Sequence, residues 1–396
     1  MDERVQFVAD FLTGGYTMSE LCRRYNVSRP TGYALVERYT RAGGPAGLLP
    51  QSRRPHTSPS ATPERESRAI VECRQRHPDW GPVKVLDYLR LRAPDRPWPA
   101  PSTAGAILKR HGLVTSRRRR RDVVPSTRPM TPMTAPNDVW TIDFKGQFRT
   151  RDGVWCYPLT VMDGATRYLL ACAGLPGTRT TPTRAVLERL FRELGLPQRI
   201  RSDNGVPFAG PTALARLSVL SVSWIRLGII PELIQPGCPA QNGRHERMHR
   251  TLKAQTARPP AGNRGAQQRR FAAFQREYND ERPHAGLGGL PPAMLYVPSP
   301  RAYPARIPPL EYAGHFERRL VSSSGSIKWR DQSIWVSEVL AGQPIGCEEI
   351  ADAEWAVYFG RVRIGTLDER LGHIRGYARP KNEAAPNHAV ANGGKC

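Results

Sequence analysis

The stretch Val139-Trp140-Thr141-Ile142-Asp143-Phe144 places one carboxylate within a run of apolar and aromatic residues. Such a run predicts a buried β-strand. An aspartate in a core strand destabilises the fold unless it is paired or bound to a metal ion. The stretch therefore predicts a buried strand, together with a partner or a metal ion for Asp143.

A second aspartate follows another short strand, expected over 198–202. Asp203 stands directly before the turn signal Asn204-Gly205, so we expect it at the carboxyl end of that strand. If the strand lies beside the one that holds Asp143, the two carboxylates come from neighbouring strands and can share a metal ion.

A third acid, Glu246, falls in the first turn of a helix that Asn242 is expected to cap and that runs to about Thr256. Helical spacing puts Glu246, Arg250 and Lys253 on one face. Asn242, Arg250 and Lys253 are candidate DNA contacts, the last two to phosphates.

Three clustered carboxylates suit Mg²⁺ or Mn²⁺, which prefer oxygen ligands. Two such ions can activate an attacking oxygen and stabilise a leaving one in phosphoryl transfer. The formal net charge of +24 favours a nucleic-acid partner, and only seven of the 59 basic residues are lysine. A GC-rich genome also enriches arginine, but it does not by itself explain the net charge.

With these motifs the chain resembles insertion-sequence transposases that have a retroviral-integrase-type catalytic core. The matching residues are Trp140-Thr141-Ile142-Asp143, Ser202-Asp203-Asn204-Gly205, Pro207-Phe208, Pro239, Asn242-Gly243, Glu246-Arg247, His249, Tyr278-Asn279, Arg282-Pro283-His284, Leu287, Pro292 and Tyr296. The resemblance implies a ribonuclease-H-like fold and a catalytic, metal-binding triad of Asp143, Asp203 and Glu246. It also implies two Mg²⁺ (or Mn²⁺) ions, DNA cleavage at element ends and attack of the freed 3′-OH on target DNA. Asp203 and Glu246 are separated by more residues in the sequence than is typical of the family. We expect an extra loop around 210–223 to account for the difference.

Two other functions stay open from the sequence. His245-Glu246-Arg247-Met248-His249 matches the H-E-x-x-H pattern of zinc metalloproteases. That interpretation gives Asp143 and Asp203 no role, and we expect His245 and His249 to pack, cap or touch phosphate instead. A DNA-binding protein with an inactive core, acting as a regulator or remnant, is the other alternative.

Residues 1–48 predict a helix-turn-helix domain with helices over 5–12, from Ser19 as a cap, and from about Ser28. The third helix presents Arg29, Thr31 and Tyr33 to a major groove. Gly32 weakens this prediction, because a branched apolar residue is more usual there. The alternative is an ordinary three-helix packing unit.

Residues 63–115 predict a second helix-turn-helix domain, with helices over 64–76, 81–91 and 102–111. Ser102 is its expected cap, and Lys109 and Arg110 are candidate DNA contacts. An arginine-rich linker over 116–136 follows and is suited to phosphates or a minor groove. Its uninterrupted basic run consists of Arg117, Arg118, Arg119, Arg120 and Arg121.

The fold class is therefore multidomain, with helical helix-turn-helix modules, an α/β ribonuclease-H-like core and a small C-terminal barrel. The core is expected over 137–300, with strands over 139–148, 154–162, 167–173 and 198–202 and helices over 182–194 and 265–279. Alternation of apolar residues predicts a small SH3-like β-barrel over 311–377, which contacts DNA or bridges subunits. A disordered tail is expected over 379–396.

Seven scattered cysteines without a C-x-x-C pair predict reduced thiols rather than disulfides or a zinc finger. No apolar run approaches the length of a membrane span. We expect a cytoplasmic, nucleoid-associated bacterial protein that binds double-stranded DNA and self-associates on it as a dimer or larger assembly, without a membrane partner.

Overall fold

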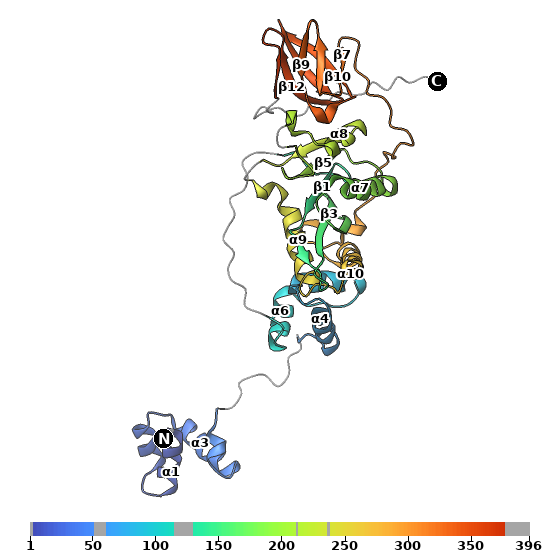
Figure 1. The fold of residues 1–396 in the computed structure, drawn as a ribbon. Helices are drawn as coiled ribbons and strands as arrows, with labels where there is room; N and C mark the ends of the chain where they lie inside the picture. Colours follow the sequence, from blue (N-terminus) through green and yellow to red (C-terminus); the bar gives the residue numbers. More distant parts are fainter. Residues whose placement is uncertain (1–2, 51–60, 115–129, 211–212, 236–237, 377–396) are drawn as a thin grey trace, which may run out of the picture. The chain divides into compact units, whose positions relative to one another are not determined.

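The computed structural model describes residues 3–50, 61–114, 130–210, 213–235 and 238–376 (Figure 1). The chain divides into two compact units, Met1–Pro63 and Glu64–Cys396. The expected basic run 117–121 and the expected disordered tail lie outside the described residues. No helix in the described part of the chain is long and apolar enough to cross a membrane.

The N-terminal unit is a three-helix bundle around Phe7, Val8 and Leu21. Its helices are α1 (Glu3–Leu12), α2 (Met18–Arg24) and α3 (Arg29–Arg41). The cap of α2 is Thr17 and not the predicted Ser19, because Thr17 and Glu20 form a reciprocal capping box. Ser28 caps α3, so this helix begins where the sequence predicted.

Close packing explains why position 32 of α3 is a glycine. A Cβ at this position would lie 2.8–2.9 Å from Met18 Sδ, Cys22 Sγ and Phe7 Cζ. The helix therefore approaches α1 and α2 more closely than a branched residue would allow, and the glycine is compatible with the predicted helix-turn-helix.

The second helical module contains α4 (Glu64–Arg76), α5 (Pro82–Arg92) and α6 (Pro101–Arg110), within one residue of the predicted bounds. Ile70, Trp80 and Leu86 lie in its core. The predicted cap Ser102 is wrong: Ala100 is at the N-cap position of α6 and makes no side-chain cap hydrogen bond. Pro101 begins this helix because its fixed φ and missing N–H suit a first turn.

The central sheet has the strand order β4-β3-β1-β5-β6, and the short β2 also pairs with β3. Its strands are β1 (Val139–Phe144), β2 (Phe148–Arg149), β3 (Trp155–Asp163), β4 (Leu169–Leu175), β5 (Arg199–Ser202) and β6 (Ile230–Leu233). Strands β1, β3 and β4 form an antiparallel meander, and β5 lies parallel to β1, as predicted. The predicted strand 139–148 is two strands, because the pairing of β1 ends at Phe144.

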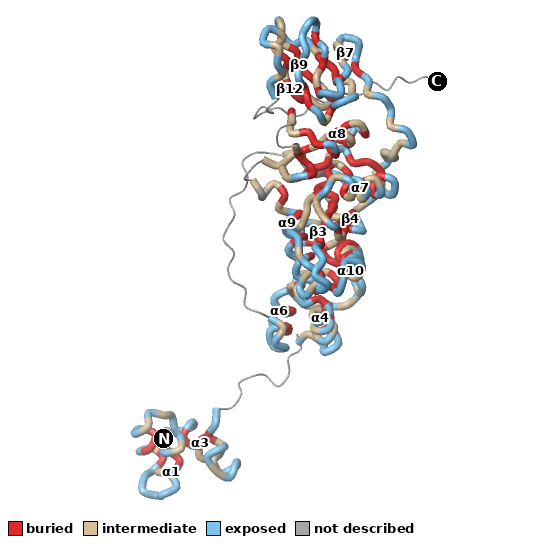
Figure 2. Tube along the Cα trace, in the orientation of Figure 1, coloured by how far each residue is buried: buried red, intermediate tan, exposed pale blue. Residues whose placement is uncertain are grey.

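Helices pack on both faces of this sheet, in which β1, β3, β4 and β5 are largely buried and β2 and β6 are mostly half-buried (Figure 2). They are α7 (Thr180–Leu194), α8 (Val219–Arg226), α9 (Gly243–Thr256) and α10 (Arg264–Arg276). Trp140 and Ile142 pack with α7 and α8 residues in one cluster. Alternation along β1 then turns Thr141 and Asp143 toward α9 on the other face. Phe271, Phe274 and Tyr278 are buried there as core residues, as expected.

The C-terminal domain consists of a five-stranded sheet, in the order β13-β12-β11-β10-β7, and the hairpin β8-β9. Its strands are β7 (Glu317–Leu320), β8 (Ser326–Trp329), β9 (Gln332–Trp335), β10 (Pro344–Ala351), β11 (Glu354–Phe359), β12 (Val362–Asp368) and β13 (His373–Gly376). Leu214 and Leu217, from the segment expected as extra loop, pack into the same core. Part of that segment is the short 3₁₀ helix Leu214–Arg216 and the start of α8. The SH3-like barrel itself stays a prediction.

Short helices complete the described chain. They are Pro45–Leu48, Pro239–Asn242, the π-helical turn Glu277–Glu281, Ala285–Leu287, Pro292–Met294 and Glu338–Leu340. The six cysteines among the described residues are free thiols.

Candidate active site

Asp143 lies near the end of β1, opposite Thr160 of β3. On the other side of β1, Ile142 pairs with Ser202 of β5, so Asp143 and Asp203 are the next residues along two adjacent parallel strands. A turn follows directly, in which Asp203 Oδ1 accepts a hydrogen bond of 3.1 Å from the Gly205 N–H. Sheet register therefore brings the first two predicted carboxylates to neighbouring strand ends.

Glu246 is exposed in the first turn of α9. Met248 and Leu252 of the same helix are buried against the sheet. Asn242 is at the N-cap position but makes no side-chain cap hydrogen bond, so the predicted capping role is wrong. Its side chain is buried and its Oδ1 has no hydrogen-bond partner among the described residues, so a contact with DNA would require it to turn outward.

The three carboxylates interact electrostatically. Burial raises the pKa of Asp143 to about 7, and the negative charges of Asp203 and, more weakly, Glu246 act in the same direction. Among the described residues, however, Asp203 and Glu246 do not join Asp143 in a group whose ligand atoms all lie within 4.8 Å. The three acids share one region, but their oxygens have not converged to the spacing of ligands on a common ion.

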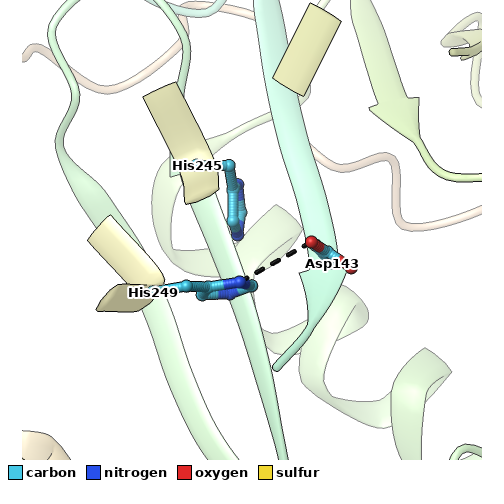
Figure 3. A group of neighbouring side chains, drawn as sticks. All are labelled: Asp143, His245 and His249. Atoms are coloured by element: carbon cyan, nitrogen blue, oxygen red, sulfur yellow. Dashed lines mark ion pairs between the residues drawn. The ribbon is translucent and has the colours of Figure 1, made fainter. Parts of the chain in front are cut away.

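The group that meets this spacing is Asp143, His245 and His249 (Figure 3). Both imidazoles point from α9 toward β1, with their ring centroids 4.6 Å apart. His249 Nδ1 lies 3.6 Å from Asp143 Oδ2. Burial lowers the pKa of His245 to about 3 and of His249 to about 2, so both rings are neutral at pH 7.

Thr160 joins the two imidazoles and was not singled out from the sequence. Its Oγ1 lies 2.6 Å from His245 Nε2 and 2.6 Å from His249 Nε2. His245 Nδ1 lies 2.8 Å from Thr141 Oγ1. Both nitrogens of His245 are thus engaged by hydroxyls and Glu246 is exposed, an arrangement that disfavours the zinc-protease alternative. The histidines pack, which is one of their expected roles.

Most other candidate DNA contacts are on the surface. Arg29, Thr31 and Tyr33 are exposed on α3, and Lys109 and Arg110 are exposed at the end of α6. Arg250 and Lys253 are exposed on α9, beyond Glu246. These positions permit contact with DNA, and the contacts themselves stay predictions.

A cavity of about 240 Å³ lies between the segment after β1 and α9. Lys145, Lys253 and Arg258 contribute positive charge to its lining, and Phe148 and Phe271 contribute apolar surface. Lys145 is two residues beyond Asp143, and its positive charge partly offsets the rise in the pKa of that carboxyl. Its position directly after the strand that carries Asp143 is the signal that could have identified it in the sequence.

Family models match most of the two helical modules and the core. Two models described as integrase core domains match residues 133–230 and 227–292. A helix-turn-helix domain model matches residues 3–56, and a homeodomain-like domain model matches residues 31–108. The homeodomain-like match begins in α3 and ends in α6, so it overlaps the helix-turn-helix match.

Relatives come from insertion elements. The chain is 28% identical over 254 residues to an uncharacterised 39.2 kDa protein of insertion element IS476 from Xanthomonas euvesicatoria, covering 63% of this chain and 70% of the relative. It is 30% identical over 190 residues to an uncharacterised 31.7 kDa protein of insertion element IS407 from Burkholderia multivorans, covering 47% of this chain and 65% of the relative. The chain is therefore similar to insertion-element transposases with an integrase-type core. It is a DNA-binding transposase of the DDE polynucleotidyl transferase class.

Viral proteins are also similar to this transposase. The Gag-Pol polyprotein of avian reticuloendotheliosis virus is 29% identical over 124 residues, which cover 31% of this chain and 10% of the polyprotein. Among solved structures, the catalytic core domain of BIV integrase is 18% identical with a TM-score of 0.31, covering 40% of this chain and 93% of that domain. The simian T-cell lymphotropic virus intasome chain is 14% identical with a TM-score of 0.36, covering 72% of this chain and 91% of that chain.

Proposed function

We propose that Asp143, Asp203 and Glu246 form the catalytic triad and hold two Mg²⁺ or Mn²⁺ ions. The raised pKa of Asp143 supports this assignment, because burial and neighbouring negative charge disfavour an ionised carboxylate unless a cation offsets them. The donor set consists of hard carboxylate oxygens, which suit these ions. When bound, the ions supply charge stabilisation to the attacking and leaving oxygens of a phosphodiester.

The reaction has two steps at one site. In the first, a water oxygen bonds to phosphorus at the element end while the P–O3′ bond breaks, which leaves a 3′-OH and a 5′-phosphate. In the second, this 3′-oxygen bonds to a target phosphorus while the target's own P–O3′ bond breaks. One phosphodiester is lost and one is formed, so the second step needs no external energy source.

The surface residues of the chain bind and orient the DNA in this proposal. Arg250 and Lys253 contact phosphates near the triad, because they follow Glu246 by one and two turns on the same exposed helix. The two helical modules bind the terminal inverted repeats through α3 and α6, and the segment 117–121 adds phosphate contacts between modules and core.

Two DNA ends must be brought together, so the active form is a dimer or a larger assembly completed on DNA. The C-terminal sheet domain, which we propose to be an SH3-like barrel, contacts DNA or bridges subunits in that assembly. We place the protein in the bacterial cytoplasm at the nucleoid, where its substrate lies.

The observation that carries the proposal is the register of Asp143 and Asp203 at adjacent strand ends. A strand-transfer assay with Mg²⁺ tests it by comparing the wild type with Asp143→Asn and with Asp152→Asn, whose carboxylate is exposed before β3. We expect Asp143→Asn to abolish product and Asp152→Asn to preserve it. Equal product from all three proteins overturns the mechanism. Failure of every protein on varied DNA ends favours the inactive-regulator alternative.

A further inference from the structure

The hydroxyl of Thr160 has three polar contacts. It lies 2.6 Å from Nε2 of His245, 2.6 Å from Nε2 of His249, and 3.1 Å from the carbonyl oxygen of Asp143. Thr160 and both histidines are buried. In a buried site each such contact has to join a donor to an acceptor, since an unmatched polar group costs about 1–3 kcal/mol.

Counting protons gives one arrangement that satisfies all three contacts. A hydroxyl donates one hydrogen and accepts two, and the Asp143 carbonyl only accepts. Thr160 therefore donates to Asp143 O and accepts from the Nε2–H groups of both imidazoles. A neutral imidazole with a proton on Nε2 has a bare lone pair on Nδ1.

The two bare nitrogens then have different surroundings. The Thr141 hydroxyl lies 2.8 Å from His245 Nδ1 and 3.2 Å from the Met162 carbonyl oxygen, and in this arrangement its single hydrogen goes to the nearer atom, His245 Nδ1. His249 Nδ1 faces Asp143 Oδ2 at 3.6 Å, which brings a lone pair toward a carboxylate oxygen (Figure 3). Two electron-rich atoms in that position favour a positive charge between them.

The distance between these two atoms distinguishes a shared proton from a metal cation. At 3.6 Å, a direct hydrogen bond between His249 Nδ1 and Asp143 Oδ2 is too long. Two ligands that each lie about 2.1 Å from one cation are roughly 3 to 3.6 Å apart. We propose that His249 supplies a nitrogen ligand, through Nδ1, to the cation that Asp143 binds.

This inference rests on the proposed triad and adds a residue to it. A site with imidazole and carboxylate donors differs from a carboxylate-only site in metal preference, because imidazole suits first-row transition ions better than Mg²⁺. The transposase should therefore bind Mn²⁺ more tightly than Mg²⁺ by a margin that depends on His249.

Electron paramagnetic resonance of Mn²⁺ tests the ligand without any measurement of activity. One equivalent of Mn²⁺ is added to the full chain, with any histidine tag removed, and electron spin echo modulation from ¹⁴N is recorded. We expect imidazole nitrogen modulation in the wild type. His249→Phe should lose it and bind Mn²⁺ about tenfold more weakly, with a change in Mg²⁺ affinity below about threefold.

His245→Phe is the matched control, since it removes the other imidazole bound to Thr160 from the same helix. It should keep the nitrogen modulation, because His245 Nδ1 is engaged by Thr141. The wild-type spectrum requires no variant, so it decides the question even if a substituted protein fails to fold.

The outcomes separate this inference from the proposed triad. In one outcome, Mn²⁺ binds to the wild type without nitrogen modulation, and Asp143→Asn abolishes this binding. That result overturns the role of His249 and leaves the proposed triad intact. Modulation that persists in His249→Phe overturns it as well. Mn²⁺ binding that is absent, or equal in wild type and Asp143→Asn, overturns the proposed triad and this inference with it.

Discussion

Asp143 and Thr160 are paired residues on β1 and β3, and the Thr160 hydroxyl lies 3.1 Å from the Asp143 carbonyl oxygen. The same hydroxyl contacts both imidazoles of α9. One buried threonine thus links the strand that carries the first acid of the proposed triad to the helix that carries the third.

Replacing Thr160 with valine should destabilise the core. The change leaves the buried Nε2 groups of His245 and His249 without their partner, at a cost of about 1–3 kcal/mol in the free energy of unfolding. Urea denaturation measures this, and Thr160→Ser should restore most of the loss. Thr183→Val is the control, because its hydroxyl donates to the carbonyl oxygen of Arg179, the N-cap residue of α7. An equally large loss there would contradict the special role of Thr160.

Asp143→Asn should stabilise the metal-free protein at high pH. The folded protein holds the Asp143 proton more tightly than the unfolded chain, so its contribution to stability is present below pH 3.8 and is lost as the pH rises to about 7. The loss amounts to at most roughly 4 kcal/mol, at 1.36 kcal/mol per pKa unit. Thermal unfolding in EDTA from pH 4 to 8 should show a gap between variant and wild type that widens with pH.

Mg²⁺ provides the check on this pH dependence. A bound cation offsets the charge of Asp143, so adding Mg²⁺ at pH 8 should raise the stability of the wild type and leave Asp143→Asn nearly unchanged. A gap that is constant across the pH range, or insensitive to Mg²⁺, would contradict the cause assigned to the raised pKa.

Arg282 should hold the second helical module against the core. Its guanidinium donates a hydrogen bond of 2.8 Å to Asp79, which lies between α4 and α5. The Arg282 side chain is buried and that of Asp79 is about one third exposed, so Arg282→Met should cost about 1–3 kcal/mol, less than a fully buried pair. Hydrogen exchange should accelerate in α4 to α6. Arg68→Met removes an exposed pair with Glu64 and should cost less than about 1 kcal/mol.

Two helical glycines should respond in opposite directions to alanine. Gly32→Ala forces a methyl group within 2.9 Å of three side chains, and should destabilise the N-terminal unit by about 1–3 kcal/mol and weaken DNA binding. At Gly105 in α6 the nearest atom to a new Cβ is 3.8 Å away, so Gly105→Ala should stabilise by up to about 1 kcal/mol. Thermal unfolding of both variants tests the pair, and stabilisation by Gly32→Ala would refute the packing argument.

Local patterns in the sequence predicted much of the fold. The apolar run around Asp143 located β1, and 3.6-residue periodicity located α4 and α9. Helix caps were predicted less well, because Ser19 and Thr17 are both suitable residues and only the backbone path shows that Thr17 bonds to Glu20. Asn242 has the right residue type for a cap, yet its side chain makes no cap hydrogen bond in the folded chain.

The sequence by itself predicted the family, the order of the domains and the three acids, because each prediction depends on residue types at short spacing. Only the tertiary structure decided the surroundings of those acids. Thr160 meets His245 and His249 across 85 and 89 residues of chain, through the register of β1 with β3 and the packing of α9 on the sheet. Burial and long-range register have no local signature, so the imidazole beside Asp143 is a property of the folded protein.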